Sequence, residues 1–241
     1  MHSETDGLGA STWMRAGAKP APMRAAVIAA LLALAPTLAR ADHAWPDGYV
    51  ARLTALARLQ ALNADLLSHN SATAVLQRWC DAHGPRPGLQ ITARLEQGPA
   101  KPAGEAERRD LQAGPDTPLR YRRVALACGD VVLSRADNWY RPDRLTPQMN
   151  RLLLETETPF GVVVAALKYQ RRTLSARPLV ELLAPGWEAQ PPQANAAPLV
   201  LPPQILEHRA VLSTPDGTPF SLVVETYADS LLTLAPAVPA T

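Results

Sequence analysis

Residues 208–227, with the sequence HRAVLSTPDGTPFSLVVETY, are predicted to form a β-hairpin. Two strand-like runs flank the turn Thr214-Pro215-Asp216-Gly217, in which Pro, Asp and Gly are typical turn residues. A second strand pair is predicted earlier in the chain, over 120–128 (RYRRVALAC) and 131–140 (VVLSRADNWY), around Gly129-Asp130. Because short turns join antiparallel strands, these two pairs predict an antiparallel sheet.

Helices are predicted before and between these strands. Leucines at helical spacing begin the pattern, a break follows at His69-Asn70-Ser71, and Ser71 can cap the next helix. Thr146-Pro147 and Thr158-Pro159 each place a capping residue before a proline at the first helical position. The predicted helices cover 47–68, 72–82, 147–155 and 160–167.

The order of these elements predicts an α+β fold. Strands are also expected over 89–97 and 169–176, and loops over 98–118 and 184–203. We therefore expect one domain over 47–230, an antiparallel β-sheet with helices packed on one face. The two short helices after the second strand pair are expected to lie over an edge or end of that sheet. A Pro/Ala-rich tail, 231–241, follows this domain.

Residues 1–41 are interpreted as an N-terminal extension and signal peptide. From Met23 the sequence MRAAVIAALLALAPTLARAD joins a basic residue, an apolar run and an Ala-x-Ala pattern at Ala39–Ala41. The run is too short to span a bilayer, which takes about 20 apolar residues. Cleavage predicts a mature protein that starts near Asp42, is periplasmic or secreted, and has no stable membrane span. An Ala/Leu-rich helix of a cytoplasmic protein is the alternative.

Charge and cysteine content limit the possible partners. The formal net charge is only +2 and no basic stripe carries interleaved aromatic residues, so nucleic acid is not an expected partner. Cys80 and Cys128 are compatible with a disulfide in an oxidising compartment, or with two buried thiols. Cys80-Asp-Ala-His83 resembles half a zinc site but lacks a second Cys/His pair, so no metal site is expected.

Common catalytic motifs are absent from the sequence, which has no Gly-x-Ser-x-Gly, no His-Glu-x-x-His and no phosphate-binding loop. Strand alternation places Arg123 on one face with Ala125 and Ala127, which leave space beside it. A guanidinium beside such space suits a bidentate carboxylate. An exposed edge arginine is the other interpretation.

Two further features could contribute to a site. The segment TETPFG (156–161) starts a helix whose free N–H groups could hold an anion, with Gly161 allowing close approach. An ordinary capped helix is the alternative. Glu225 is the one carboxylate in an apolar strand, where it could bind a hydroxyl or act as an acid. A charge that protects an edge strand from aggregation is the alternative.

Three segments, in this order along residues 71–230, resemble the chorismate pyruvate-lyase family. That family removes pyruvate from chorismate to give 4-hydroxybenzoate for ubiquinone biosynthesis. The resemblance implies a sheet with helices on one face, two helical flaps over an internal ligand cavity, and no metal or organic cofactor. The fold is also similar to the effector-binding domain of one class of bacterial transcription regulators. The matching segments are RRVALACGDVVLSRADNWYRPDRLT, TPFG and LEHRAVLSTPDGTPFSLVVETY.

The resemblance also implies roles for individual residues. Arg123 matches the arginine that binds the substrate carboxylate, and Glu225 matches the glutamate at the hydroxyl and ether end, so both are candidate catalytic residues. Phe160 and Gly161 match the flap segment whose main chain contacts the ligand. Ala72 stands where the family has a methionine near the ligand.

Two functions are expected on these grounds. One is a lyase that eliminates pyruvate from chorismate. The other is an exported, non-catalytic binding module for a small aromatic or cyclic carboxylic acid, because chorismate is a cytosolic metabolite and the chain carries a signal-like segment. In both, the expected partner is a small-molecule carboxylate.

Overall fold

The computed structural model describes residues 48–190 and 199–233. The signal-like segment and all but the first residues of the predicted tail lie outside this part of the chain. No helix among the described residues has both the length and the apolar character that crossing a membrane requires.

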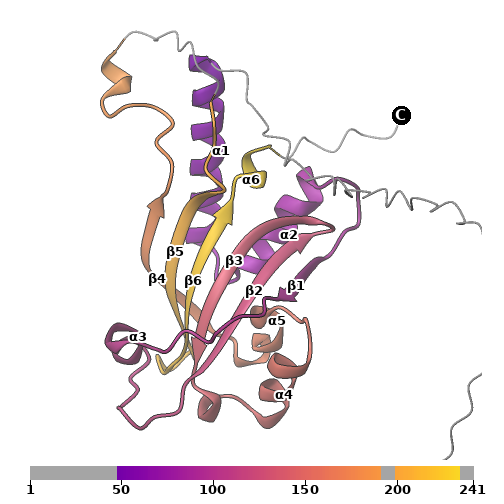
Figure 1. Cartoon of the computed structure of the whole chain (residues 1–241), viewed down its shortest axis with the longest axis vertical. Coiled ribbons are helices and arrows are strands. Elements are labelled where there is room, and N and C mark those ends of the chain that lie inside the picture. Colours follow the sequence, from indigo (N-terminus) through magenta and orange to yellow (C-terminus); the bar gives the residue numbers. More distant parts are fainter. Residues whose placement is uncertain (1–47, 191–198, 234–241) are drawn as a thin grey trace, which may run out of the picture. The chain divides into compact units, whose positions relative to one another are not determined.

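A six-stranded sheet, in the order β1-β2-β3-β6-β5-β4, forms the centre of the domain (Figure 1). Every neighbouring pair is antiparallel, which confirms the predicted α+β class. The two predicted strand pairs are the hairpins β2–β3 and β5–β6, and β3 pairs with β6 to join them. The strands are β1 (Ile91–Leu95), β2 (Arg120–Cys128), β3 (Val131–Tyr140), β4 (Gln170–Pro178), β5 (Gln204–Ser213) and β6 (Pro219–Ala228).

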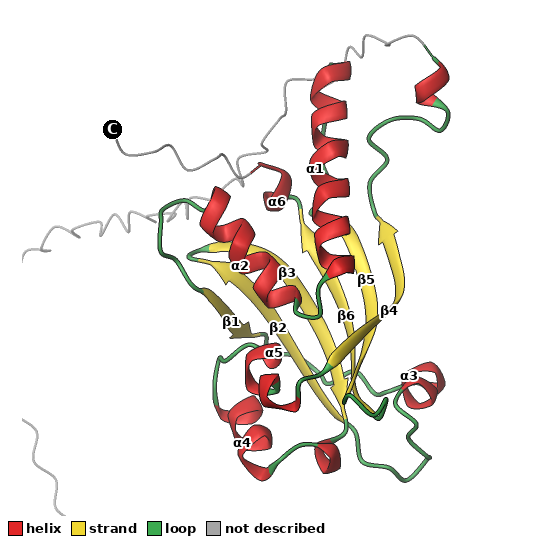
Figure 2. Ribbon diagram, turned by 180° about the vertical axis from the view of Figure 1, so that it is seen from behind, coloured by secondary structure: helices red, strands yellow, loops and turns green. Residues whose placement is uncertain are grey.

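The longer helices cover one face of this sheet (Figure 2). The predicted caps form: the Ser71 hydroxyl accepts from Ala74 N at 3.2 Å, and the Thr146 hydroxyl accepts from Met149 N at 3.1 Å. The core continues beyond residue 230, since Leu231 and Leu232 are buried. The helices are α1 (Tyr49–Ser68), α2 (Ala72–His83), α3 (Glu105–Asp110), α4 (Pro147–Glu155), α5 (Phe160–Val163) and α6 (Ser230–Thr233), with 3-10 turns at Pro142–Arg144, Ala165–Leu167 and Trp187–Ala189.

Two local predictions need correction. The helix expected over 160–167 is a four-residue α-helix followed by a 3-10 turn, and the Thr158 hydroxyl accepts from Thr156 instead of capping it. Helix α3 lies in a segment expected to be a loop. It starts where the Glu107 carboxylate accepts from Gly104 N at 2.9 Å, and Arg209 holds the same carboxylate at 2.8 Å. The segment that carries α3 crosses the face opposite α1 and α2 (Figure 1).

Cys80 and Cys128 form a disulfide, which resolves the two alternatives for this pair. The bond ties α2 to the end of β2, with the two Cα atoms 5.8 Å apart. Gly84 lies against it so closely that an added Cβ would be 2.9 Å from the Cys128 sulfur and 2.3 Å from the Cys80 carbonyl oxygen. One end of α2 is therefore fixed to the sheet.

Candidate ligand-binding site

A cavity of about 50 Å³ lies between the helix-covered face of the sheet and the N-terminal ends of α2 and α5. Its walls come from five strands and from the two helix starts that the resemblance implied as flaps. Predicted site residues Ala72, Phe160, Gly161 and Glu225 all line it. The other lining residues are Asn70, Ser71, Thr73, Arg122, Val124, Leu126, Ala136, Asn138, Tyr169, Arg171, Leu212 and Val223.

Strand register explains which side chains meet there. Arg122 pairs with Asn138, which pairs with Val223. The next row on the same face runs from Val124 through Ala136 to Glu225. Since paired residues point to the same side of a sheet, Arg122 and Glu225 share a face, separated by two strand spacings and by two residues along the strand, or roughly 11–12 Å between Cα atoms.

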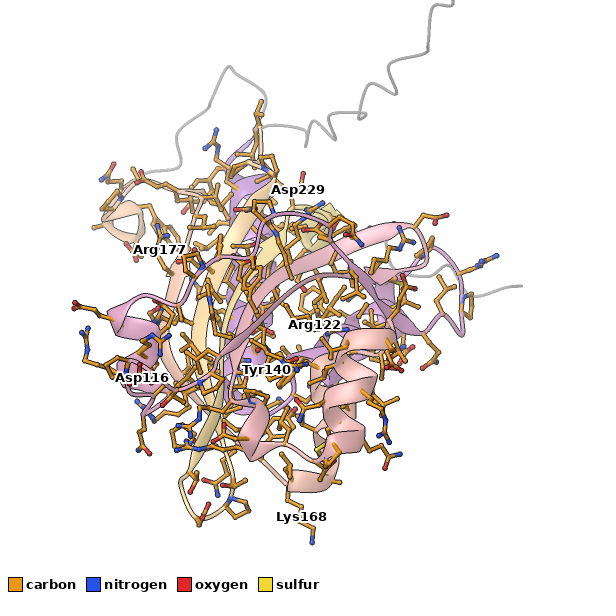
Figure 3. All side chains as sticks on the ribbon, turned by 60° about the horizontal axis from the view of Figure 1, so that its bottom comes forward. Asp116, Arg122, Tyr140, Lys168, Arg177 and Asp229 are labelled. Carbon is orange, nitrogen blue, oxygen red and sulfur yellow. A yellow bond between two sulfur atoms is a disulfide. The ribbon has the colours of Figure 1, made fainter. Side chains whose placement is uncertain are left out.

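Arg122 is a buried guanidinium without a counter-ion among the described residues. It is 6% exposed, and one nitrogen, Nη2, donates to the carbonyls of Thr156 and Thr158 at 3.3 and 3.0 Å. Within the described part of the chain, its Nε and Nη1 atoms have no hydrogen-bond partner. Burial lowers the pKa of Arg122, as expected where no carboxylate compensates the charge. Figure 3 shows this residue between the sheet and the helices that follow β3.

Arg171 and Glu225 form a buried ion pair in the same cavity. Their closest atoms are 2.6 Å apart, and the side chains are 4% and 8% exposed. Burial is the largest single effect on the pKa of Arg171 and lowers it, but the charge and hydrogen bond of Glu225, together with Tyr227 and Tyr169, outweigh it, so the pKa is raised. The Tyr227 hydroxyl donates to the same carboxylate oxygen at 3.1 Å. The lone glutamate in the apolar strand is thus compensated by an arginine on the edge strand β4.

Arg123 lies on the opposite face, so the prediction that it shares a cavity with Glu225 is wrong. Its side chain is 44% exposed and pairs with Glu96 at 3.0 Å and Asp137 at 3.7 Å. The alternation of side chains along β2 was predicted correctly, but the helices cover the face that carries Arg122, not the face that carries Arg123. The signal for Arg122 was present, since it alternates with Val124 and apolar neighbours on a face that had to be buried. Arg171 had no comparable signal.

The TETPFG segment contributes carbonyl oxygens to this site. The Thr156 and Thr158 carbonyls accept from Arg122, whereas N–H groups were expected to face an anion. Gly161 is needed for close packing: an added Cβ would lie 2.9 Å from the Tyr169 hydroxyl oxygen and 3.6 Å from Ser71 Oγ. Burial raises the pKa of Tyr169, so this phenol is uncharged at neutral pH.

An open groove of about 660 Å³ lies next to the contact between Gly161 and Tyr169. It shares Asn70, Ser71, Thr73, Gly161 and Tyr169 with the cavity, so these residues form a seam between the groove and the cavity. Lys168 also borders the groove, and its side chain extends away from the domain (Figure 3). The seam between α2 and α5 is the place where a ligand could pass.

These features define an α+β domain with a small, positively charged cavity next to an open groove. The chain belongs to the same family as the uncharacterized protein y4mC of Sinorhizobium fredii (strain NBRC 101917 / NGR234), to which it is 47% identical over 212 residues. The match covers 86% of this chain and 90% of that protein. The sequence matches no family model.

Solved structures resemble the fold only distantly. PhnF from Mycobacterium smegmatis has a TM-score of 0.44 and 14% identity, and the match covers 73% of this chain and 71% of that one. The effector domain of PhnF gives 0.42 and 14%, over 67% and 90%. A GntR-family transcriptional regulator from Enterococcus faecalis V583 gives 0.32 and 15%, over 58% and 92%. At these scores they say nothing about the ligand of this chain.

The seam can be tested by adding and removing single atoms. Gly161→Ala puts a methyl group against the Tyr169 hydroxyl, so it should destabilise the fold by about 1–3 kcal/mol, as overpacking does. Tyr169→Phe removes that oxygen, and in its background Gly161→Ala should be neutral or stabilising. Urea unfolding of the four proteins measures the coupling, expected above about 0.5 kcal/mol. Equal effects of Gly161→Ala in both backgrounds would contradict the contact.

Proposed function

We propose that this domain encloses a small cyclic or aromatic carboxylic acid. Its carboxylate binds Arg122, and a hydroxyl or ether oxygen at its far end lies near Glu225. The observation that carries the proposal is the buried guanidinium of Arg122, which has no counter-ion and has two nitrogens without partners among the described residues. A carboxylate supplies the charge and the acceptors that this group lacks.

Energetics support an anion at this position. A buried donor without a partner costs about 1–3 kcal/mol, and more when it is charged. Arg171 shows the compensated case, because Glu225 neutralises it in the same cavity. A ligand carboxylate at Arg122 would do for that residue what Glu225 does for Arg171.

The closed cavity is smaller than such a ligand. Benzene occupies an engineered cavity of roughly 150 Å³, whereas the space here is about 50 Å³. The starts of α2 and α5 must therefore separate for the ligand to enter. The seam that Gly161 and Tyr169 form is the contact that opens.

The two neighbouring arginines provide a matched test. Arg122→Gln removes the charge and should weaken 4-hydroxybenzoate binding by about 1.5–3 kcal/mol, the range for hydrogen bonds to charged groups. Arg123→Gln makes the same change on the other face and should leave binding unaltered. Isothermal titration calorimetry at neutral pH measures both. A loss with Arg123→Gln and none with Arg122→Gln would refute the proposed site.

A second candidate function is chorismate lyase activity, which the order of the three matching segments favours. Elimination breaks the C3–O bond of chorismate, removes the C4 proton and aromatises the ring, so that 4-hydroxybenzoate and pyruvate result. Such a reaction needs mainly positioning, which an enclosed site supplies. Glu225 pairs with Arg171 at 2.6 Å and accepts a hydrogen bond from the Tyr227 hydroxyl, so its carboxyl oxygens are placed to accept a proton or a hydrogen bond from a ligand. This geometry disfavours the acid role expected for Glu225.

Turnover of chorismate separates the two candidates. A lyase should release equal amounts of pyruvate and 4-hydroxybenzoate, and Glu225→Gln should slow it by about 10²-fold or more if Glu225 takes up the proton. Pyruvate is followed with a coupled dehydrogenase and 4-hydroxybenzoate by chromatography, with Arg123→Gln as the control variant. Wild-type protein that binds 4-hydroxybenzoate but releases no pyruvate would leave the binding module as the function.

We also propose that the protein is exported. The Cys80–Cys128 disulfide supports this, because such bonds persist in oxidising compartments, and so does the Ala-x-Ala pattern before Asp42. The mass of the protein isolated from its native cells should correspond to a chain that starts near Asp42. An intact segment from Met23 to Ala41 would restore the cytoplasmic alternative.

A further inference from the structure

Three charged side chains line the cavity. Arg122 and Arg171 carry positive charge and Glu225 carries negative charge. The nearby titratable groups are neutral at neutral pH, since burial raises the pKa of the Tyr227 hydroxyl and lowers the pKa of the His208 imidazole. Arg171 is compensated by Glu225, so one positive charge, that of Arg122, is left for a ligand.

We propose that the cavity is matched to a monoanion: its ligand brings one carboxylate to Arg122 and an uncharged polar group to Glu225, and dicarboxylates are excluded. This inference rests on the proposed function, since it specifies the charge of the ligand that the same site encloses. It also assigns Glu225 the role of a specificity-determining residue.

The exclusion follows from the arrangement of the three groups. A second carboxylate at the far end of the ligand would lie beside Glu225 and compete for Arg171, whose charge is already used. Two carboxylates at one site cannot both remain ionised without a large cost. In a water-excluded cavity, that cost is not recovered from solvent. An uncharged amide or hydroxyl, in contrast, can donate a hydrogen bond to Glu225.

Chorismate illustrates the consequence, because it carries two carboxylates. One could bind Arg122, but the one on the enolpyruvyl group would then have to remain outside the cavity, in the groove that Lys168 borders. A hydroxylated ring with a single carboxylate fits the enclosed space without this difficulty.

Three para-substituted benzoates of similar shape test charge apart from size. Terephthalate is a dianion at pH 7.5, whereas 4-carbamoylbenzoate and monomethyl terephthalate are monoanions. The wild-type protein should bind both monoanions at least about 100-fold more tightly than terephthalate, since an unpaired buried charge is costly. The ester has no N–H to donate, so its affinity shows whether charge alone decides. Titration calorimetry gives the three dissociation constants.

The variant Glu225→Gln should reverse this preference. It leaves both arginines without an internal counter-ion, so terephthalate should bind at least as tightly as 4-carbamoylbenzoate. Equal binding of monoanions and dianion by the wild-type protein, with Arg122→Gln weakening all three, would overturn the inference and keep the proposed function. Failure of 4-hydroxybenzoate and all three probes to bind would overturn both. If Glu225→Gln does not fold, the wild-type comparison alone decides.

Discussion

The buried ion pair between Arg171 and Glu225 determines what the rest of the site can do. It reaches from the edge strand β4 across β5 to β6, and the Tyr227 hydroxyl adds a hydrogen bond to it. The ring of Tyr227 packs edge-on against His208, which hydrogen-bonds Asn63 of α1 at 2.8 Å. Burying two charges is expensive even when they are paired, so the pair is not explained by stability alone. Its effect on the cavity is to neutralise one guanidinium and leave the other available.

Arg122 and Arg123 of β2 lie on opposite faces of the sheet, and their surroundings differ accordingly. Arg122 faces the cavity, where solvent is excluded and a charge interacts strongly with an anion. Arg123 faces outward and pairs with carboxylates in a half-exposed network, where each pair contributes little. The two residues are adjacent and of the same type, and they differ only because side chains alternate between the two faces of a strand. Comparing the same substitution at each position therefore tests the effect of the surroundings.

Much of the fold could be predicted from the sequence because its signals are local. The turns at Gly129 and Gly217, and the caps at Ser71 and Thr146, each depend on a few adjacent residues. Helix α3 was missed because its short sequence is held partly by Arg209 from a distant strand.

The site was only partly predictable for the same reason. The cavity positions of Glu225, Phe160, Gly161 and Ala72 followed from the resemblance. The choice between Arg122 and Arg123 depended on which face the helices cover, and Arg171 meets Glu225 only through tertiary packing.

If a ligand binds as proposed, Arg122 also connects its site to the flap that opens. Its Nη2 atom holds the carbonyls of Thr156 and Thr158, which lie just before α5, while its other nitrogens are free for a ligand. The other flap, the start of α2, is less free to move. The disulfide and the Gln77 side chain tie α2 to the sheet and to the segment before β1. A four-residue helix such as α5 has little structure of its own to lose. In the proposed mode of binding, opening on the α5 side would therefore release the flap from Arg122, and a bound carboxylate that fixes this guanidinium would favour the closed flap.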